Sequence, residues 1–343
     1  KFKYIISFIL IVFSILVSTN LIIIKTDGYK KRLAEILQNI EPKECDPNFE
    51  DCSNLSKVTK EEICPDINNC KFNVSSKRRI YIVGDSHAQV LIPNLKKQII
   101  KRDYQFITAA RGGCFFFPGF NKVKIKTQNV DNFCHNNYFV ELEEELKKYQ
   151  NSVIIFIGRL PLYLSNYYFD NKEGGIEDDI IMANDTKLGK QWKNTFVSIG
   201  KYKTIQTSFS DTVNKLSKNN KIILIYPVPE VGWHVPRKIL QQNPAIFFSS
   251  TKKNNLENIT TSYQVYKERT ELSFKLLDSI KGKNIYQIYP HQLFCDILIK
   301  DRCVTHDKKD IFYEDEDHLS FRGVEMLNNL IIKKVDEINK KTN

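Results

Sequence analysis

A serine stands where a buried strand is expected to end, in the segment Gly84-Asp85-Ser86-His87. Gly84 allows a sharp turn after the apolar run 79–83, and a helical pattern follows. A serine at such a turn can act as a nucleophile, and its own backbone N–H can stabilise the charge on an attacked carbonyl oxygen. The alternative is structural, because Asp85 or Ser86 can simply cap the next helix.

A serine nucleophile needs a base, and the strongest candidate lies near the other end of the chain. Asp315 and His318 are three residues apart, just before the last helical pattern. The imidazole could take the serine proton, and the carboxylate could orient the imidazole. The alternative is an acidic turn in which Ser320 caps the helix. With only six histidines in the chain, the pairing of the two segments favours the catalytic interpretation.

The elements that must position these residues alternate along the chain. Apolar runs predict strands at 79–83, 104–109, 152–157, 221–226 and 284–288, and amphipathic patterns predict helices at 90–101, 140–149, 205–217, 263–280 and 321–338. Strands this apolar, alternating with helices, indicate an α/β fold with a parallel sheet covered on both faces. Functional groups gather at the carboxyl ends of such strands, which is where Ser86 falls.

Composition limits the class of protein. The chain has 343 residues, of which 42% are hydrophobic and 27% charged, so it can bury a core. Its 51 basic and 40 acidic residues give a net charge of +11. The lysines are spread along the chain without a dense basic block, so we expect no nucleic-acid partner.

The amino-terminal part predicts a membrane anchor. Residues 4–24 are almost wholly apolar and uncharged, which suits one transmembrane helix within 1–25. A cleaved signal peptide is the alternative, but the small-residue cleavage pattern is missing. Residues 26–77 are expected to form a cysteine-containing connector, and residues 78–343 the catalytic domain.

The cysteines indicate the compartment. The chain has eight, mostly in pairs, and none has zinc-site spacing, which favours disulfides and an oxidising environment. The positive charge after the predicted span would instead place the domain in the cytoplasm. We give the cysteines more weight and expect an extracytoplasmic domain, in a periplasm, at a cell surface or in a secretory lumen.

The two catalytic segments together resemble a known family. G-D-S-H early and D-x-x-H-L-S late are similar to SGNH (GDSL-like) hydrolases, and most similar to the SGNH domains fused to acyltransferase-3 membrane proteins, which O-acylate glycans. The resemblance covers residues 78–340 and implies a three-layer α/β/α, flavodoxin-like fold. It also implies that residues 4–24 are the last span of a membrane acyltransferase portion, which would supply an acyl group, expected to be acetyl from acetyl-CoA.

The resemblance assigns roles to individual residues. Ser86 resembles the nucleophile, His318 the base and Asp315 its orienting acid. The backbone N–H groups of Ser86 and Gly113 resemble oxyanion donors. Arg159 stands where hydrolases have a donor asparagine and could itself donate to the oxyanion; an ion pair at the strand end is its alternative.

Further residues follow from the same resemblance. Cys114–Cys134 and Cys295–Cys303 would form disulfides beside the site, although any one cysteine could be free. Leu160 replaces a tryptophan that is usual in the fused domains, which puts that sugar platform in doubt. Independently of the resemblance, Trp233 and His234 lie on another strand-end loop, where they could bind a sugar or only fill the loop.

The function implied is transfer of an acyl group, expected to be acetyl, through acyl-Ser86 to an extracytoplasmic glycan, with no metal, nucleotide or other cofactor in this domain. Two alternatives stay open. The same acyl-serine could be hydrolysed by water, which would make the domain a carbohydrate esterase. The domain could also be a non-catalytic, membrane-anchored module that binds glycans.

Overall fold

The computed structural model describes residues 70–177, 191–242 and 258–342, with isolated helical residues between Tyr4 and Asn20. Most of the predicted membrane span at 4–24 and most of the predicted connector at 26–77 therefore lie outside the described residues. Among the residues that are described, no helix is both long and apolar enough to cross a membrane.

A six-stranded sheet with the order β1-β3-β2-β5-β7-β9 forms the centre of the domain. Its five long strands run parallel, as predicted, but the short edge strand β1 pairs antiparallel with β3. The strands are β1 (Lys71–Phe72), β2 (Arg79–Gly84), β3 (Gln105–Ala110), β5 (Val153–Ile157), β7 (Lys221–Ile225) and β9 (Ile285–Ile288). The prediction of a parallel sheet is thus confirmed for all strands except β1.

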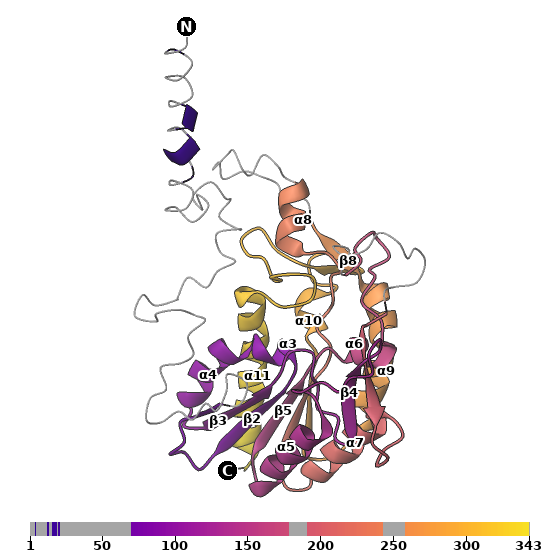
Figure 1. Ribbon diagram of the computed structural model, residues 1–343. Helices are drawn as coiled ribbons and strands as arrows, with labels where there is room; N and C mark the ends of the chain where they lie inside the picture. Colours follow the sequence, from indigo (N-terminus) through magenta and orange to yellow (C-terminus); the bar gives the residue numbers. More distant parts are fainter. Residues whose placement is uncertain are drawn as a thin grey trace.

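Helices cover both faces of this sheet, because the side chains of its strands alternate between two apolar cores (Figure 1). In β2, Ile80 and Ile82 face one core, and Tyr81 and Val83 face the other. The first core is covered by α4 (Ile92–Ile100) and α11 (Phe321–Thr342). The second is covered by α5 (Asn136–Lys148), α7 (Ile205–Leu216) and α9 (Tyr263–Ser279). All five correspond to predicted helices, although α5 begins four residues before the predicted start.

Shorter elements, which the sequence did not predict, build the end of the sheet where the chemistry is expected. Two small antiparallel pairs, β4 with β6 and β8 with β10, stand apart from the main sheet. The remaining elements are α3 (Ser86–Gln89), β4 (Phe120–Lys124), α6 (Leu160–Ser165), β6 (Asn194–Ser198), α8 (Val235–Gln242), β8 (Thr260–Ser262), α10 (His291–Phe294) and β10 (Arg302–Val304).

Two disulfides brace this end of the domain. Cys114 is bonded to Cys134 and Cys295 to Cys303, as the resemblance implied. Cys70 is also disulfide-bonded, and the described residues include no free cysteine.

Candidate active site

The turn after β2 presents Ser86 at the start of α3. Gly84 is required there, because a Cβ atom at this position would lie 1.8 Å from the carbonyl oxygen of Ile157. Asp85 caps α3 by accepting the backbone N–H of His87 at 2.9 Å. Ser86 is the first residue of the helix and is half-buried. The capping function therefore belongs to Asp85, and it leaves the hydroxyl of Ser86 free for chemistry.

The same aspartate ties this turn to the turn after β5. Asp85 is fully buried, and its second oxygen accepts the backbone N–H of Arg159 and the hydroxyl of Tyr163, each at 2.7 Å. Two neighbouring strand ends are thus locked together directly beneath Ser86.

The loop before α11 holds His318 in one orientation. The Nδ1–H of His318 donates to Asp315 Oδ2 at 2.7 Å, and Asp315 Oδ1 accepts the backbone N–H groups of Asp317 and His318. Nε2 is therefore the nitrogen left to act as a base. It is buried and has no hydrogen-bond partner in the described ranges.

The protonation of His318 is controlled by the carboxylates around it. Burial lowers its pKa, but the hydrogen bond to Asp315 and the charges of Asp317, Asp315 and Asp85 outweigh burial and raise the pKa to about 9. Burial also raises the pKa of Asp315, but the hydrogen bond to His318 outweighs this effect and leaves that pKa below its usual range.

The structure brings the predicted triad together in part. The pair Asp315–His318 is formed, but because Nε2 has no partner, the hydrogen bond from Ser86 is not. The residues on either side of Ser86, Asp85 and His87, both interact with His318. The ring of His87 lies 5.1 Å from the ring of His318, and the charge of Asp85 acts on His318. Catalytic hydrogen bonds are often long in the absence of substrate.

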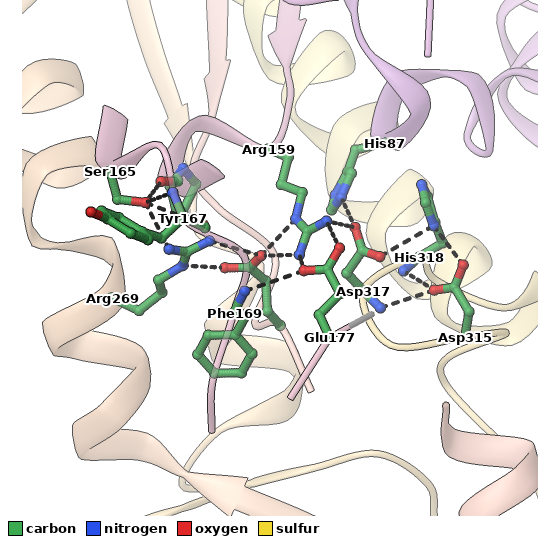
Figure 2. Close-up of polar contacts among 12 residues, drawn as sticks. His87, Arg159, Ser165, Tyr167, Phe169, Glu177, Arg269, Asp315, Asp317 and His318 are labelled. Carbon is green, nitrogen blue, oxygen red and sulfur yellow. Dashed lines mark hydrogen bonds and ion pairs between the residues drawn. The ribbon is translucent and has the colours of Figure 1, made fainter. Parts of the chain in front are cut away.

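Arg159, the predicted side-chain oxyanion donor, is fully engaged by carboxylates (Figure 2). Its guanidinium binds Glu177 through both terminal nitrogens, Glu230 through Nε at 2.6 Å, and Asp317 through Nη1 at 3.2 Å. The ion pair that the sequence offered as the alternative is what the structure contains. We therefore do not include the Arg159 side chain among the oxyanion donors.

Four charged residues of this network were not singled out by the sequence. Arg269 donates to Glu230 at 2.7 Å and extends the network away from Arg159. Burial of charges on this scale is tolerated only when they are paired. The available signals were weak: Glu230 interrupts an apolar strand end, and Asp317 lies within the catalytic segment. The four residues are Glu177, Glu230, Arg269 and Asp317.

Gly113 lies in a tight turn, from Arg111 to Cys114, that follows β3. Its φ of +62° favours glycine. Its carbonyl oxygen accepts a hydrogen bond from the ammonium group of Lys122 at 3.1 Å. A Cβ atom on Gly112 would lie 3.5 Å from Gln89, a residue of α3. The turn therefore borders the helix that begins with Ser86, and the disulfide Cys114–Cys134 anchors it.

Trp233 and His234 line a pocket of about 240 Å³ beside the loop that precedes α11 and carries His318. Glu177 and Glu316 contribute to its wall, as do Arg237, Lys238 and Gln241 of α8. The backbone N–H groups of Val231 and Gly232 donate to the carbonyl of Glu316, which fixes the pocket against the loop before α11. Leu160, in contrast, is buried and offers no surface to a sugar.

The ligand-type atoms of His87, Asp317 and His318 lie within 4.8 Å of one another, as metal ligands would. The guanidinium of Arg159 already stands 3.2 Å from Asp317 and provides a positive charge there. We therefore interpret the cluster as an ion-pair network.

A parallel α/β sheet with a serine at one strand end, and an Asp–His pair on the loop before the last helix, is typical of serine-dependent acyl chemistry. Residues 51–333 match the family model described as the SGNH domain (fused to AT3 domains), and the chain belongs to this family. The match begins upstream of the predicted boundary at residue 78.

Comparisons with individual proteins give more distant similarity. No curated protein matches the chain. Among solved structures, the chain is similar to the periplasmic domain of a lipopolysaccharide acetyltransferase from Salmonella ser. Paratyphi A, with 17% identity over 76% of this chain and 84% of that one and a TM-score of 0.46. It is also similar to a possible lipase from Chitinophaga pinensis, with 10% identity over 76% and 98% of the two chains and a TM-score of 0.32.

Proposed function

We propose that this domain transfers an acyl group, in the first instance acetyl, to a hydroxyl of an extracytoplasmic glycan through an acyl-Ser86 intermediate. The observation that carries the proposal is the pair His318–Asp315, whose Nε2 is buried and unpartnered beside the helix that begins with Ser86. This pair leaves a single nitrogen as the base, and within the described residues no protein group forms a hydrogen bond with it.

The proposed reaction has two halves. Ser86 Oγ attacks the acyl carbonyl while its proton passes to His318 Nε2, and the N–H groups of Ser86 and Gly113 stabilise the oxyanion. His318 returns the proton to the leaving group, and acyl-Ser86 forms. A sugar hydroxyl then gives its proton to His318 and attacks the acyl carbon, and His318 passes that proton to Ser86 Oγ as Ser86 leaves. Asp315 holds the ring throughout.

The donor, the acceptor and the location follow from different observations. Fusion to AT3 domains in the family supports delivery of the acyl group from a membrane acyltransferase portion. The pocket lined by Trp233 and His234 is our candidate acceptor site, because it adjoins the catalytic loop through Glu316. The disulfides Cys114–Cys134 and Cys295–Cys303 support an oxidising, extracytoplasmic location.

The test is Ser86→Ala in the full chain, with the exposed Ser75→Ala as the matched control. With p-nitrophenyl acetate as the probe, we expect an acetyl adduct on the Ser86 peptide of the wild-type protein and of Ser75→Ala, detected by mass spectrometry. Ser86→Ala should lose this adduct and should reduce turnover by about 10³-fold or more.

The same pair of proteins distinguishes transfer from hydrolysis in cells. We expect cells that produce the wild-type chain or Ser75→Ala to carry O-acetylated surface glycan, measured by NMR, and cells with Ser86→Ala to lack it. Unchanged acetylation with Ser86→Ala would favour the non-catalytic module. Lower acetylation with wild type than with Ser86→Ala would identify an esterase instead.

A further inference from the structure

The two residues next to the proposed nucleophile and base are joined directly. His87, which follows Ser86, donates its Nε2–H to Oδ2 of Asp317, which precedes His318, at 2.9 Å (Figure 2). The side chains of both partners are only 4% exposed, and 230 positions separate them in the sequence. A contact of this kind links the turn after β2 to the loop before α11 at the point where Ser86 and His318 must meet.

Asp317 is held as a carboxylate by the groups around it. Besides His87, it faces Nη1 of Arg159 at 3.2 Å and Nδ1 of His318 at 3.5 Å. Burial raises its pKa, but Arg159, His87 and His318 together outweigh burial and hold the pKa far below its usual range. A buried negative charge this close to His318 acts on the imidazole whether or not the two form a good hydrogen bond.

His87 is fixed from two sides. Its backbone N–H donates to Asp85, and its ring packs 5.1 Å from the ring of His318, tilted by 45°. Moving either end of the contact between His87 and Asp317 would therefore displace α3 or the loop before α11.

From this geometry we propose that His87 and Asp317 are positioning residues: they form a brace that sets the approach of Ser86 to His318, and Asp317 serves as a second carboxylate on the base beside Asp315. This inference rests on the proposed acyl-transfer function. It separates two contributions, because His87 acts through distance alone, whereas Asp317 acts through both distance and charge.

Several charged groups face His318, and a test must separate them. Asp315, Asp317 and Glu314 belong to its own loop, and Asp85 and His87 come from the turn after β2 and from α3. Asp317 is the acidic member of this set that also belongs to the brace, because it contacts both His87 and His318.

The experiment compares Asp317→Asn with His87→Phe in the full chain, with p-nitrophenyl acetate as the probe. His87→Phe removes the brace but keeps the pair between Arg159 and Asp317. It should lower kcat by about 10²-fold, which is the cost of misplacing a catalytic group by about 1 Å, with little change in KM. The pKa of His318, followed by NMR of labelled imidazole, should stay close to the wild-type value.

Asp317→Asn should lower kcat and also lower the pKa of His318, so that the rising limb of the pH profile of kcat/KM moves to lower pH. The double variant should lose less than the product of the two single losses, because both variants break one contact. Thermal melting of each variant shows whether it is folded, and His87→Phe alone tests the brace if Asp317→Asn is not.

The outcomes separate this inference from the proposed function. Suppose that Asp317→Asn and His87→Phe are folded, keep the wild-type kcat and leave the pKa of His318 unchanged, while Ser86→Ala is inactive. This result would overturn the brace and leave the acyl-serine mechanism standing. Full activity in Ser86→Ala would overturn the function itself.

Discussion

On the proposed mechanism, the raised pKa of His318 has opposite effects on activity and on stability. Its pKa rises from an ordinary 6.5 to about 9 in the folded protein, so the imidazole is mostly protonated at neutral pH and must lose that proton to act as a base. We predict that kcat/KM for p-nitrophenyl acetate increases with pH up to about 9. Asp315→Asn should move this rise to lower pH and reduce kcat, because both the charge and the orientation are lost. A midpoint near 6.5 in the wild-type protein would contradict this account.

The same rise in the pKa of His318 stabilises the folded protein at low pH, where the protonated imidazole cannot act as a base. Because the folded state binds this proton more tightly than the unfolded chain, the stabilisation is fully present below pH 6.5 and is lost as pH rises through about 9. The free energy of unfolding, measured with urea across this pH range, should therefore fall while kcat/KM rises.

At the scale of single residues, the sequence predicted the chemical types better than their partners. Ser86, Asp315 and His318 were singled out because their types and spacing match a known chemistry, and the structure contains the contact between Asp315 and His318. The partners of Arg159 could not be predicted, because Glu177 and Glu230 look like any surface carboxylate until the fold buries them. Pairing of this kind depends on which loops meet, and no local pattern records it.

At the scale of elements, the turn between β2 and α3 depends on Gly84. We predict that Gly84→Ala destabilises the protein by at least about 2 kcal/mol, because the added methyl group meets the backbone of Ile157, which cannot yield as a side chain would. Gly282→Ala is the matched control, since its Cβ would meet only Ile285 at an ordinary 3.6 Å, and its effect should stay within about 0.5 kcal/mol. Equal urea midpoints for the two variants would contradict this prediction.

The elements that the sequence predicted are those with a strong apolar pattern. The run in β5 is buried at all five positions, whereas β4 and β6 mix buried and exposed residues and form only an isolated pair. β1 has two residues and α3 and α10 have four each, which is too short for a periodic signal. One of these short elements, α3, begins with Ser86, so the proposed nucleophile lies in a part of the fold that is hard to predict.

At the scale of the whole molecule, Arg159 joins three separate loops. We predict that Arg159→Met costs about 3–5 kcal/mol in urea unfolding at neutral pH, because it leaves buried carboxylates without their main partner. Arg322, whose side chain is 45% exposed in its ion pair with Glu325, is the control, and Arg322→Met should cost less than about 1 kcal/mol.

The pH dependence of this loss provides a second check. Without Arg159, the pKa of Asp317 should rise, and the carboxylates should take up protons at mildly acidic pH. The difference in unfolding free energy between Arg159→Met and the wild-type protein should therefore shrink as the pH falls. A loss that does not depend on pH would indicate that the side chain contributes packing alone.

The contact between His87 and Asp317 has a consequence for the order of events during synthesis. Its two partners are 230 positions apart, so a chain that has emerged only through its first strands carries the serine but not the histidine. On the proposed mechanism, a growing chain therefore lacks its base until the loop before α11 has been synthesised. If the proposed mechanism holds, an incomplete copy would carry Ser86 without its base, and it would neither acylate nor hydrolyse the molecules around it.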